Sequence, residues 1–352
     1  MTRGQAVRAW GKILSGKAPM LSIEITRECP LHCPGCYAYG DQHLGGGVTL
    51  RELSDLRGDA LVEGVLGLVR RHAPLQVSLV GGEPLVRHRE LDRILPELSR
   101  MGVYTLLVTS AVIPIPPEWC SLPGVRIAVS IDGLREDHDK RRHPATYDRI
   151  LGNVHGRRID ISWVVTGPMM RRPGYLDEYL AFWTSMSEVD RIWLNVYTPQ
   201  VDERSEEALC PDDRRKLVAA LPDLKRRYPR LLMTEGIASA FAVPPASPDE
   251  CTFAKMSLNY SADLRTRVDP CFYGGQPDCG QCGCAVTAGL HWVGQMPLLG
   301  PLRVKHVMDG SIAFGSLVSR MRNGGMDGIR WKPLQRKSGN GARNGNGLVQ
   351  LH

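Results

Sequence analysis

Short apolar runs alternate with amphipathic segments along the first two thirds of the chain. Each run has the length of a buried strand, and most of the segments between them repeat apolar residues at helical spacing. The predicted strands are residues 21–26, 75–80, 103–108, 126–131, 159–165 and 191–196. Six strands joined by crossovers predict an α/β fold built as a partial (β/α)6 barrel around a parallel sheet.

The crossovers themselves are predicted to be mainly helical. The predicted helices are residues 49–71, 89–101, 146–154 and 175–187, whereas residues 110–123 are expected to form a loop. Thr49 and Glu52 match a capping box, in which each side chain binds the backbone N–H of the other residue. The first helix is therefore expected to begin at Thr49.

Residues that could bind a ligand or take part in catalysis follow the ends of the first four predicted strands. They are Cys29, Cys33, Cys36, then Gly81, Gly82, Glu83, Pro84, then Thr109, Ser110, and finally Ser130 and Asp132. The carboxyl ends of barrel strands meet at one mouth, where ligands bind. We therefore expect these residues to share one site.

Composition and charge narrow the classes of protein. The 352 residues are 43% hydrophobic, enough for a large core, and the net charge of +7 is spread along the chain rather than gathered in one stripe. With aromatic residues at only 6%, nucleic-acid binding is not expected. No long apolar run or signal peptide is present, so no membrane association and a cytoplasmic location are expected.

Ten cysteines in a cytoplasmic chain indicate metal binding rather than disulfides. Cys120 and Cys210 stand alone, and each is expected to be either a buried thiol or one without a function. Cys29, Cys33 and Cys36 put three thiolates on one loop, whereas structural zinc needs four ligands, and His32 is a poor fourth. Three thiolates suit a [4Fe-4S] cluster that leaves one iron open to another molecule.

The C-x3-C-x2-C spacing of these cysteines resembles that of the radical S-adenosylmethionine superfamily, with likeness over residues 20–199. The resemblance implies that the open iron binds the amino and carboxylate groups of S-adenosylmethionine. It also implies reductive cleavage to methionine and a 5'-deoxyadenosyl radical, which takes a hydrogen atom from a substrate. No catalytic acid or base can be named from the sequence.

The same resemblance implies further cofactor contacts. Gly81-Gly82-Glu83-Pro84 resembles the element that binds the methionine amino group, and Thr109 and Ser110 follow the next strand. Arg142, in a run similar to H-D-x-x-R, would bind the carboxylate unless it belongs to a solvated loop. Ser130 and Asp132 would contact the ribose or the carboxylate. Val165 would contact the adenine unless it belongs to the packed core. Tyr37 would also contact the adenine, in place of the aromatic residue that the family usually has at the position of Gly35.

A second group of cysteines follows a boundary placed near residues 244–245. Its members are Cys251, Cys271, Cys279, Cys282 and Cys284. A hairpin with arms at residues 256–260 and 264–268 is predicted between the first two. The segment resembles the Twitch or SPASM-like auxiliary module, which implies a second [4Fe-4S] cluster on the first four cysteines, with Cys284 as competitor and zinc as alternative. Such a cluster would transfer electrons or be structural.

These expectations divide the chain into four parts and leave several functions open. The parts are an N-terminal extension (1–19), the barrel (20–243), the auxiliary domain (244–325) and a disordered basic tail (326–352). The main hypothesis is a radical enzyme, an oxidoreductase or related, acting on a small molecule such as a sugar-type or natural-product precursor, with flavodoxin or ferredoxin as reducing partner. The alternatives are a peptide (RiPP) maturase, a non-catalytic iron–sulfur electron carrier and a zinc-binding nucleic-acid module.

Overall fold

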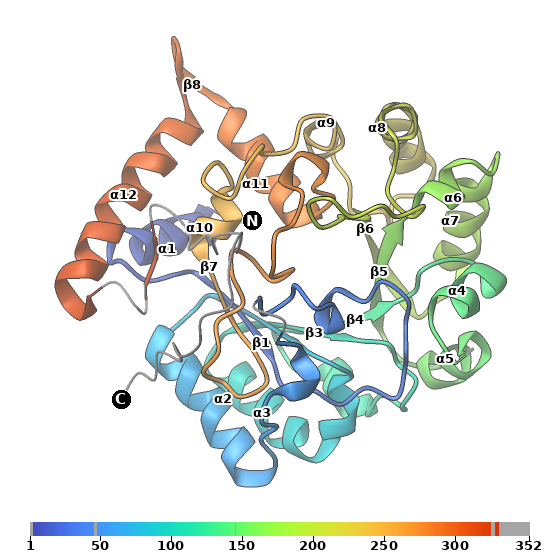
Figure 1. Cartoon of the computed structure of the whole chain (residues 1–352), viewed down its shortest axis with the longest axis horizontal. Helices are drawn as coiled ribbons and strands as arrows, with labels where there is room; N and C mark the ends of the chain where they lie inside the picture. Colours follow the sequence, from blue (N-terminus) through green and yellow to red (C-terminus); the bar gives the residue numbers. More distant parts are fainter. Residues whose placement is uncertain (1–2, 46–47, 145, 325–327, 331–352) are drawn as a thin grey trace, which may run out of the picture.

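A seven-stranded parallel sheet forms the centre of the molecule (Figure 1). The computed structural model describes residues 3–45, 48–144, 146–324 and 328–330. The six strands expected from the sequence are present, each within two residues of its predicted bounds. They are β1 (Met20–Glu24), β2 (Gln76–Val80), β3 (Tyr104–Thr109), β4 (Val125–Ser130), β5 (Ile159–Val165) and β6 (Val189–Val196). Their order in the sheet follows the chain, which confirms the partial barrel.

The seventh strand comes from the C-terminal third. β7 (Ser257–Tyr260) pairs in parallel with β1, with Met20 opposite Ser257. This segment was expected to be one arm of a hairpin in a separate module. The hairpin is present, because Ser261 N donates to Thr266 O (2.8 Å) and Tyr260 bridges Arg267. Its first arm is nevertheless part of the barrel sheet.

Helices pack on the sheet through their apolar faces. Those that follow β1 to β6 are α2 (Gly58–His72), α3 (His88–Arg100), α4 (Arg135–Arg141), α5 (Tyr147–Val154), α6 (Gly167–Met170), α7 (Tyr175–Ser185), α8 (Pro211–Arg227) and α9 (Glu235–Ala240). Leu61, Val65 and Val69 of α2 recur at helical spacing and are completely buried. They join the large core that also contains the strand residues Ile23 and Leu79.

The helix expected from Thr49 begins nine residues later than predicted. The Thr49 backbone N–H does donate to the Glu52 side chain (3.3 Å), but this pair closes only the 3-10 turn Leu50–Glu52. Asp55 then accepts hydrogen bonds from Thr26 Oγ1 (3.1 Å) and Arg27 N (3.3 Å). These contacts tie the connecting segment to the end of β1, so α2 starts only at Gly58.

The C-terminal third adds helices along one side of the barrel. α10 (Thr252–Met256) directly precedes β7, whereas α11 (Ala285–Gln295) and α12 (Val304–Asn323) follow it, and the hairpin β8 (Pro297–Leu299) and β9 (Leu302–Arg303) precedes α12. With α1 (Arg3–Leu14), α10 and α12 enclose a small second core of Ile13, Met256, Met308, Ile312 and Ile329. No helix in the described parts could span a membrane. Of the disordered tail expected at residues 326–352, residues 326–327 and 331–352 lie outside the described residues, whereas Ile329 is buried in the second core and is not disordered.

Candidate functional site

The loop that carries Cys29, Cys33 and Cys36 leaves β1 at the mouth of the barrel, and all three thiols are partly buried. Its start is bonded to the turn after β2, since Gly82 N donates to Thr26 O (2.8 Å) and Glu83 N to Glu28 O (2.7 Å). A Cβ atom on Gly82 would lie 2.1 Å from the Glu28 carbonyl oxygen. Glycine is therefore required where the turn passes the cysteine loop.

Glu83 is buried at this turn and its carboxylate is fully engaged. It accepts hydrogen bonds from Leu85 N (2.9 Å), from Ser110 N (2.7 Å) and from the hydroxyl groups of Thr109 and Ser110. Pro84 follows at the first position of a short helical turn. Thr109 and Ser110, expected to contact the cofactor, thus hold Glu83 in the structure.

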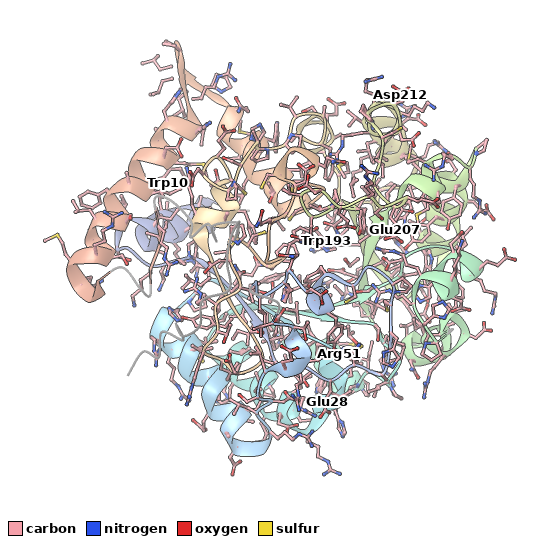
Figure 2. The ribbon with its side chains drawn as sticks, in the orientation of Figure 1. Trp10, Glu28, Arg51, Trp193, Glu207 and Asp212 are labelled. Atoms are coloured by element: carbon pink, nitrogen blue, oxygen red, sulfur yellow. The ribbon has the colours of Figure 1, made fainter. Side chains whose placement is uncertain are left out.

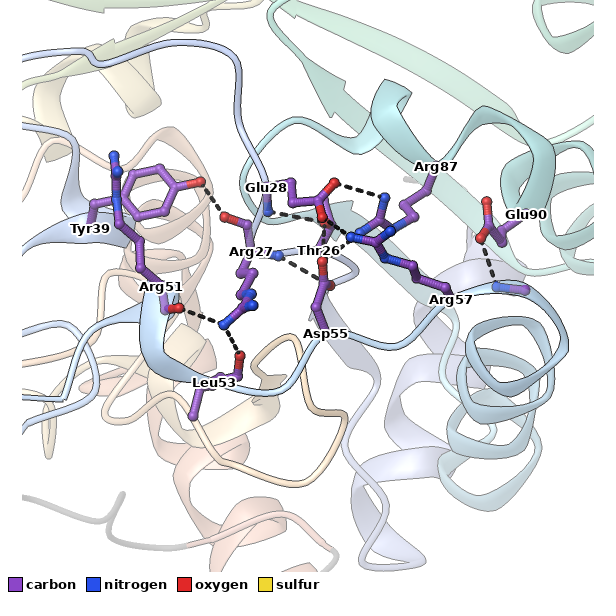
Figure 3. A network of polar contacts seen from close by, with 11 residues as sticks. Thr26, Arg27, Glu28, Tyr39, Arg51, Leu53, Asp55, Arg57, Arg87 and Glu90 are labelled. Atoms are coloured by element: carbon purple, nitrogen blue, oxygen red, sulfur yellow. Dashed lines mark hydrogen bonds and ion pairs between the residues drawn. The ribbon is translucent and has the colours of Figure 1, made fainter.

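An ionic network below the cysteine loop was not anticipated from the sequence (Figure 3). The buried Arg87 side chain pairs with Glu28 (Nη1 to Oε2, 3.0 Å) and with the equally buried Asp55. Arg57 pairs with the same Glu28 from the surface. Because Glu28 precedes Cys29 directly, the network fixes the base of the loop that carries the three thiols.

Asp132 and two arginines lie beside the cysteine loop, since His32 N donates to His143 O (2.7 Å). Asp132 Oδ2 binds Arg141 Nη1 and Arg142 Nη2 (2.8 Å each), while its buried Oδ1 has no hydrogen-bond partner in the described chain. Burial opposes ionisation of Asp132, but the two guanidinium groups outweigh it and hold its pKa below the usual value. Arg142 also favours the thiolate of Cys33 electrostatically, although burial raises the pKa of that thiol.

The Arg141 side chain is occupied more completely than that of Arg142. Its Nε and Nη2 atoms donate to Glu207 (2.7 and 3.0 Å), in a bidentate pair that adds to its contact with Asp132. Glu207 lies near β6 in Figure 2, in the segment that follows that strand. Arg142 therefore has the fewer fixed partners and is the better placed of the two to meet a ligand carboxylate.

The other predicted contacts have different surroundings. Val165 is completely buried and its carbonyl oxygen accepts from Tyr197 N (3.0 Å). Ser130 is partly buried and pairs with Ser162 at the end of β4. Tyr37 packs its ring against Tyr273, with centroids 5.5 Å apart, rather than projecting freely over the mouth.

The five cysteines of the C-terminal group line one cavity. Cys251 and Cys284 are the N-cap residues of α10 and α11. Arg214 of α8 supports the intervening loop by donating to Gln281 O (2.7 Å) and Cys282 O (3.2 Å). The sequence groups these cysteines correctly, but nothing in its spacing indicates Arg214.

Burial makes ionisation of the free thiols unfavourable. It raises the pKa of Cys29 to about 11 and that of Cys279 to about 12. A bound metal reverses this preference, because a coordinating thiol loses its proton outright. In the described ranges, no three Cys, His, Asp or Glu side chains are grouped as around a single metal ion.

Aromatic and polar contacts connect the two cysteine groups. Tyr37, next to Cys36, contacts Phe272 (centroids 6.0 Å apart), which adjoins Cys271. His43 Nε2 contacts Glu24 Oε1 (2.6 Å), and its Nδ1 atom lies 2.9 Å from Tyr273 O. The latter contact makes Nδ1 a donor, because a carbonyl oxygen can only accept. The loops that bear the two groups are thus held against each other.

Comparison with known proteins identifies the barrel. Residues 23–181 match the family described as the Radical SAM superfamily. A PqqA peptide cyclase of Bradyrhizobium diazoefficiens is 28% identical over 146 residues, which are 40% of this chain and 34% of that protein. A probable GTP 3',8-cyclase of Methanocella arvoryzae is 26% identical over 132 residues, 37% of this chain and 38% of that protein. The chain thus matches little more than a third of the length of either relative.

Two solved structures share the fold. SuiB of Streptococcus suis, bound to precursor peptide SuiA, superposes with a TM-score of 0.52 at 16% identity, covering 73% of this chain and 62% of SuiB. Native anSMEcpe with bound AdoMet superposes with a TM-score of 0.54 at 16% identity, covering 72% of this chain and 74% of that one. Both likenesses extend beyond the 159 residues from 23 to 181.

Proposed function

The chain belongs to the radical SAM superfamily, and on that premise we propose that it cleaves S-adenosylmethionine reductively and abstracts a hydrogen atom from a substrate. A [4Fe-4S] cluster held by Cys29, Cys33 and Cys36 supplies the electron that starts this chemistry. The observation that carries the proposal is the position of these thiols, on a loop facing the Asp132–Arg142 pair.

The chain's own residues suit such a cofactor. Three protein thiolates leave one iron open, and Arg142 can make a charge-assisted contact with the methionine carboxylate. The unpartnered Oδ1 of Asp132 is a buried acceptor suited to a ribose hydroxyl. Gly81 and Gly82 keep backbone groups accessible to the amino group, while Glu83 fixes the turn through Thr109 and Ser110.

A second [4Fe-4S] cluster is proposed for the C-terminal cavity. Cys251, Cys271, Cys279 and Cys282 are the preferred ligands, with Cys284 as the competitor, because all five line the same space. Four thiolates close every iron, so the group would exchange electrons rather than bind substrate. The aromatic contact of Tyr37 with Phe272, which adjoins Cys271, supports a location of this second cluster next to the cysteine loop of the barrel.

A peptide is the better candidate substrate. The small molecule expected from the sequence is supported by the GTP 3',8-cyclase relative. The PqqA peptide cyclase relatives and the likeness to SuiB, solved with a precursor peptide, favour a peptide-modifying reaction. Peptides and small molecules deuterated at carbon can be compared directly, since the true substrate transfers deuterium into 5'-deoxyadenosine.

The cluster proposal is tested with anaerobically reconstituted protein. We expect about eight irons per chain from two four-iron clusters, and 5'-deoxyadenosine when dithionite and S-adenosylmethionine are added. The triple variant Cys29→Ala, Cys33→Ala, Cys36→Ala should keep about four irons and form no 5'-deoxyadenosine. The double variant Cys120→Ala, Cys210→Ala is the matched control and should behave as wild type. Cleavage of S-adenosylmethionine by the triple variant would show the proposal to be wrong.

A further inference from the structure

Helix α12 turns its more apolar face outward. The face packed against the protein carries Ser311, Gly315, Ser316 and Ser319 beside Met308 and Ile312. The outward face carries Val307, Phe314, Leu317 and Met321, whose exposed fractions are 39%, 55%, 55% and 80%. A helix that only covers a core has the opposite pattern. We call these four residues the α12 stripe.

The surroundings of the stripe add to its exposed apolar surface. α12 lies at one edge of the molecule, and the β8–β9 hairpin projects from its N-terminal end (Figure 1). Leu299 of that hairpin is 80% exposed. On the inner side, Trp10 of α1 donates to Ser311 Oγ (2.9 Å), so α12 is fixed in this orientation (Figure 2). Exposed apolar patches of this kind mark docking surfaces.

The charges around the stripe identify what kind of partner fits. α1, α11 and α12 together contain one carboxylate, Asp309, and that group pairs with Lys255 (3.3 Å). Within the described residues, no carboxylate pairs with Arg8, Lys305, Arg320 or Arg322. The surface is therefore apolar with basic ends, and it complements an acidic one.

The same charges argue against the chain itself as the occupant. A second copy related by a two-fold axis, with its α12 antiparallel, would bring Arg320 and Arg322 towards Lys305 of the partner. Like charges placed face to face oppose association. Residues 331–352 contain Lys332, Arg336, Lys337 and Arg343 and no carboxylate side chain. Neither arrangement neutralises the surface.

The stripe lies directly behind the second group of cysteines. Met308 and Ile312 of α12 share a core with Met256, the last residue of α10. Cys251, the N-cap of α10, is five residues away, which is roughly 8 Å along a helix. Leu290 of α11, the helix that Cys284 caps, packs on the same core. A protein docked on α12 would thus be separated from the cavity by little more than one layer of helices.

We propose that the α12 stripe docks an acidic one-electron carrier protein that exchanges electrons with the auxiliary cluster. The step moves one electron from the reduced carrier to the cluster, so the carrier is oxidised and the cluster reduced, and no bond is made or broken. The proposal rests on the proposed second cluster for its electron acceptor. It goes further by naming the docking surface and the charge of the partner.

Flavodoxin hydroquinone, an acidic flavoprotein, is the probe, and bleaching of the iron–sulfur absorbance is followed by anaerobic stopped flow. Phe314→Ser/Leu317→Ser and Arg320→Glu should each slow the second-order rate about tenfold at low salt. The effect of Arg320→Glu should shrink at high salt, where charges are screened. Phe182→Ser and Arg149→Glu, on other exposed surfaces, are the matched controls and should react as wild type.

Dithionite separates docking from cluster chemistry, because it needs no docking surface and should reduce all variants equally. Unchanged flavodoxin rates in both α12 variants, or no electron transfer to the wild type, would overturn the proposal. The proposal would also be wrong if the wild type were a dimer and Phe314→Ser/Leu317→Ser made it dissociate. It would be wrong as well if the wild type sedimented with phosphatidylglycerol vesicles and this variant did not. If the removal of residues 331–352 increased the binding of an apolar fluorescent dye, the occupant of the α12 stripe would be the chain's own tail, and the proposal would be wrong. If no 5'-deoxyadenosine formed with dithionite, the proposed function would be wrong, whereas the docking proposal would not be contradicted.

Discussion

His138 shows how one buried residue makes the barrel mouth sensitive to pH. Its Nδ1 atom accepts a hydrogen bond from Asp132 N (3.2 Å), so the neutral ring carries its proton on Nε2, which faces Thr146 Oγ1 (3.3 Å). Burial, and then the nearby Arg142 cation, lower the pKa of His138 to about 4. The folded protein thus keeps this imidazole neutral at pH values where an unfolded chain would protonate it.

The sign of the resulting pH dependence follows from proton uptake. Between the ordinary pKa of 6.5 and about 4, the unfolded chain binds more protons than the folded chain. Stability from His138 is therefore full above about pH 6.5 and falls by about 2 kcal/mol between pH 7 and pH 5. In the variant His138→Asn the amide oxygen can replace Nδ1 as acceptor, and this variant should lose less stability between pH 7 and pH 5. We expect a smaller drop in its thermal unfolding midpoint over this range, and an equal drop would contradict the assignment.

Single residues also show what a sequence can and cannot tell about the site. Cys29, Cys33 and Cys36 were identified because their spacing alone limits the metal centres they can hold. The partners of Glu83 and Asp132 were not, because Thr109 reaches Glu83 from the end of β3 and Arg141 reaches Asp132 from the end of α4. Such pairings depend on how loops fold over the mouth, and no local periodicity records that.

At the scale of elements, the segment between β1 and α2 depends on the Arg87 network. Arg87 and Asp55 are both almost fully buried, with side-chain exposures of 6% and 4%. Arg87→Met leaves a buried carboxylate without its cation, so we expect a loss of about 3–5 kcal/mol in the free energy of unfolding. Urea denaturation followed by tryptophan fluorescence measures this loss.

Arg57→Met is the matched control for that prediction. Arg57 pairs with the same network through Glu28, but its side chain is 66% exposed. Exposed ion pairs contribute at most about 1 kcal/mol, so this variant should be nearly as stable as wild type. Equal losses in both variants would show that the buried network does not fix the loop. Iron content should fall in Arg87→Met alone, because Glu28 adjoins Cys29.

The network also explains why the start of α2 was predicted wrongly. The capping pattern at Thr49 and Glu52 is local and correct, yet it caps only one turn. Asp55 lies a few residues later and binds Thr26 and Arg87, which are distant in sequence. Tertiary contacts of this kind override helix propensity, which is a weak preference in any short segment.

At the scale of the whole molecule, the barrel and the C-terminal third are joined more closely than the sequence suggested. Strands β1 to β6 could be predicted because each is a short apolar run between crossovers. The pairing of β7 with β1 could not, because the two strands are more than 200 residues apart and residues 256–260 look like an ordinary hairpin arm. Parallel pairing leaves no turn between the strands to identify.

This pairing predicts that the barrel does not fold without its C-terminal third. Removing residues 244–352 would leave β1 as an edge strand with a row of unpaired backbone groups, which invites aggregation. It would also remove Ser261, which donates to the buried Glu24 carboxylate. Fragment 1–243 should therefore aggregate and bind little iron, whereas fragment 1–330 should elute as wild type in size-exclusion chromatography and keep about eight irons. A monomeric 1–243 fragment with about four irons would instead establish the barrel as an independent domain, with β7 as a dispensable addition to its sheet.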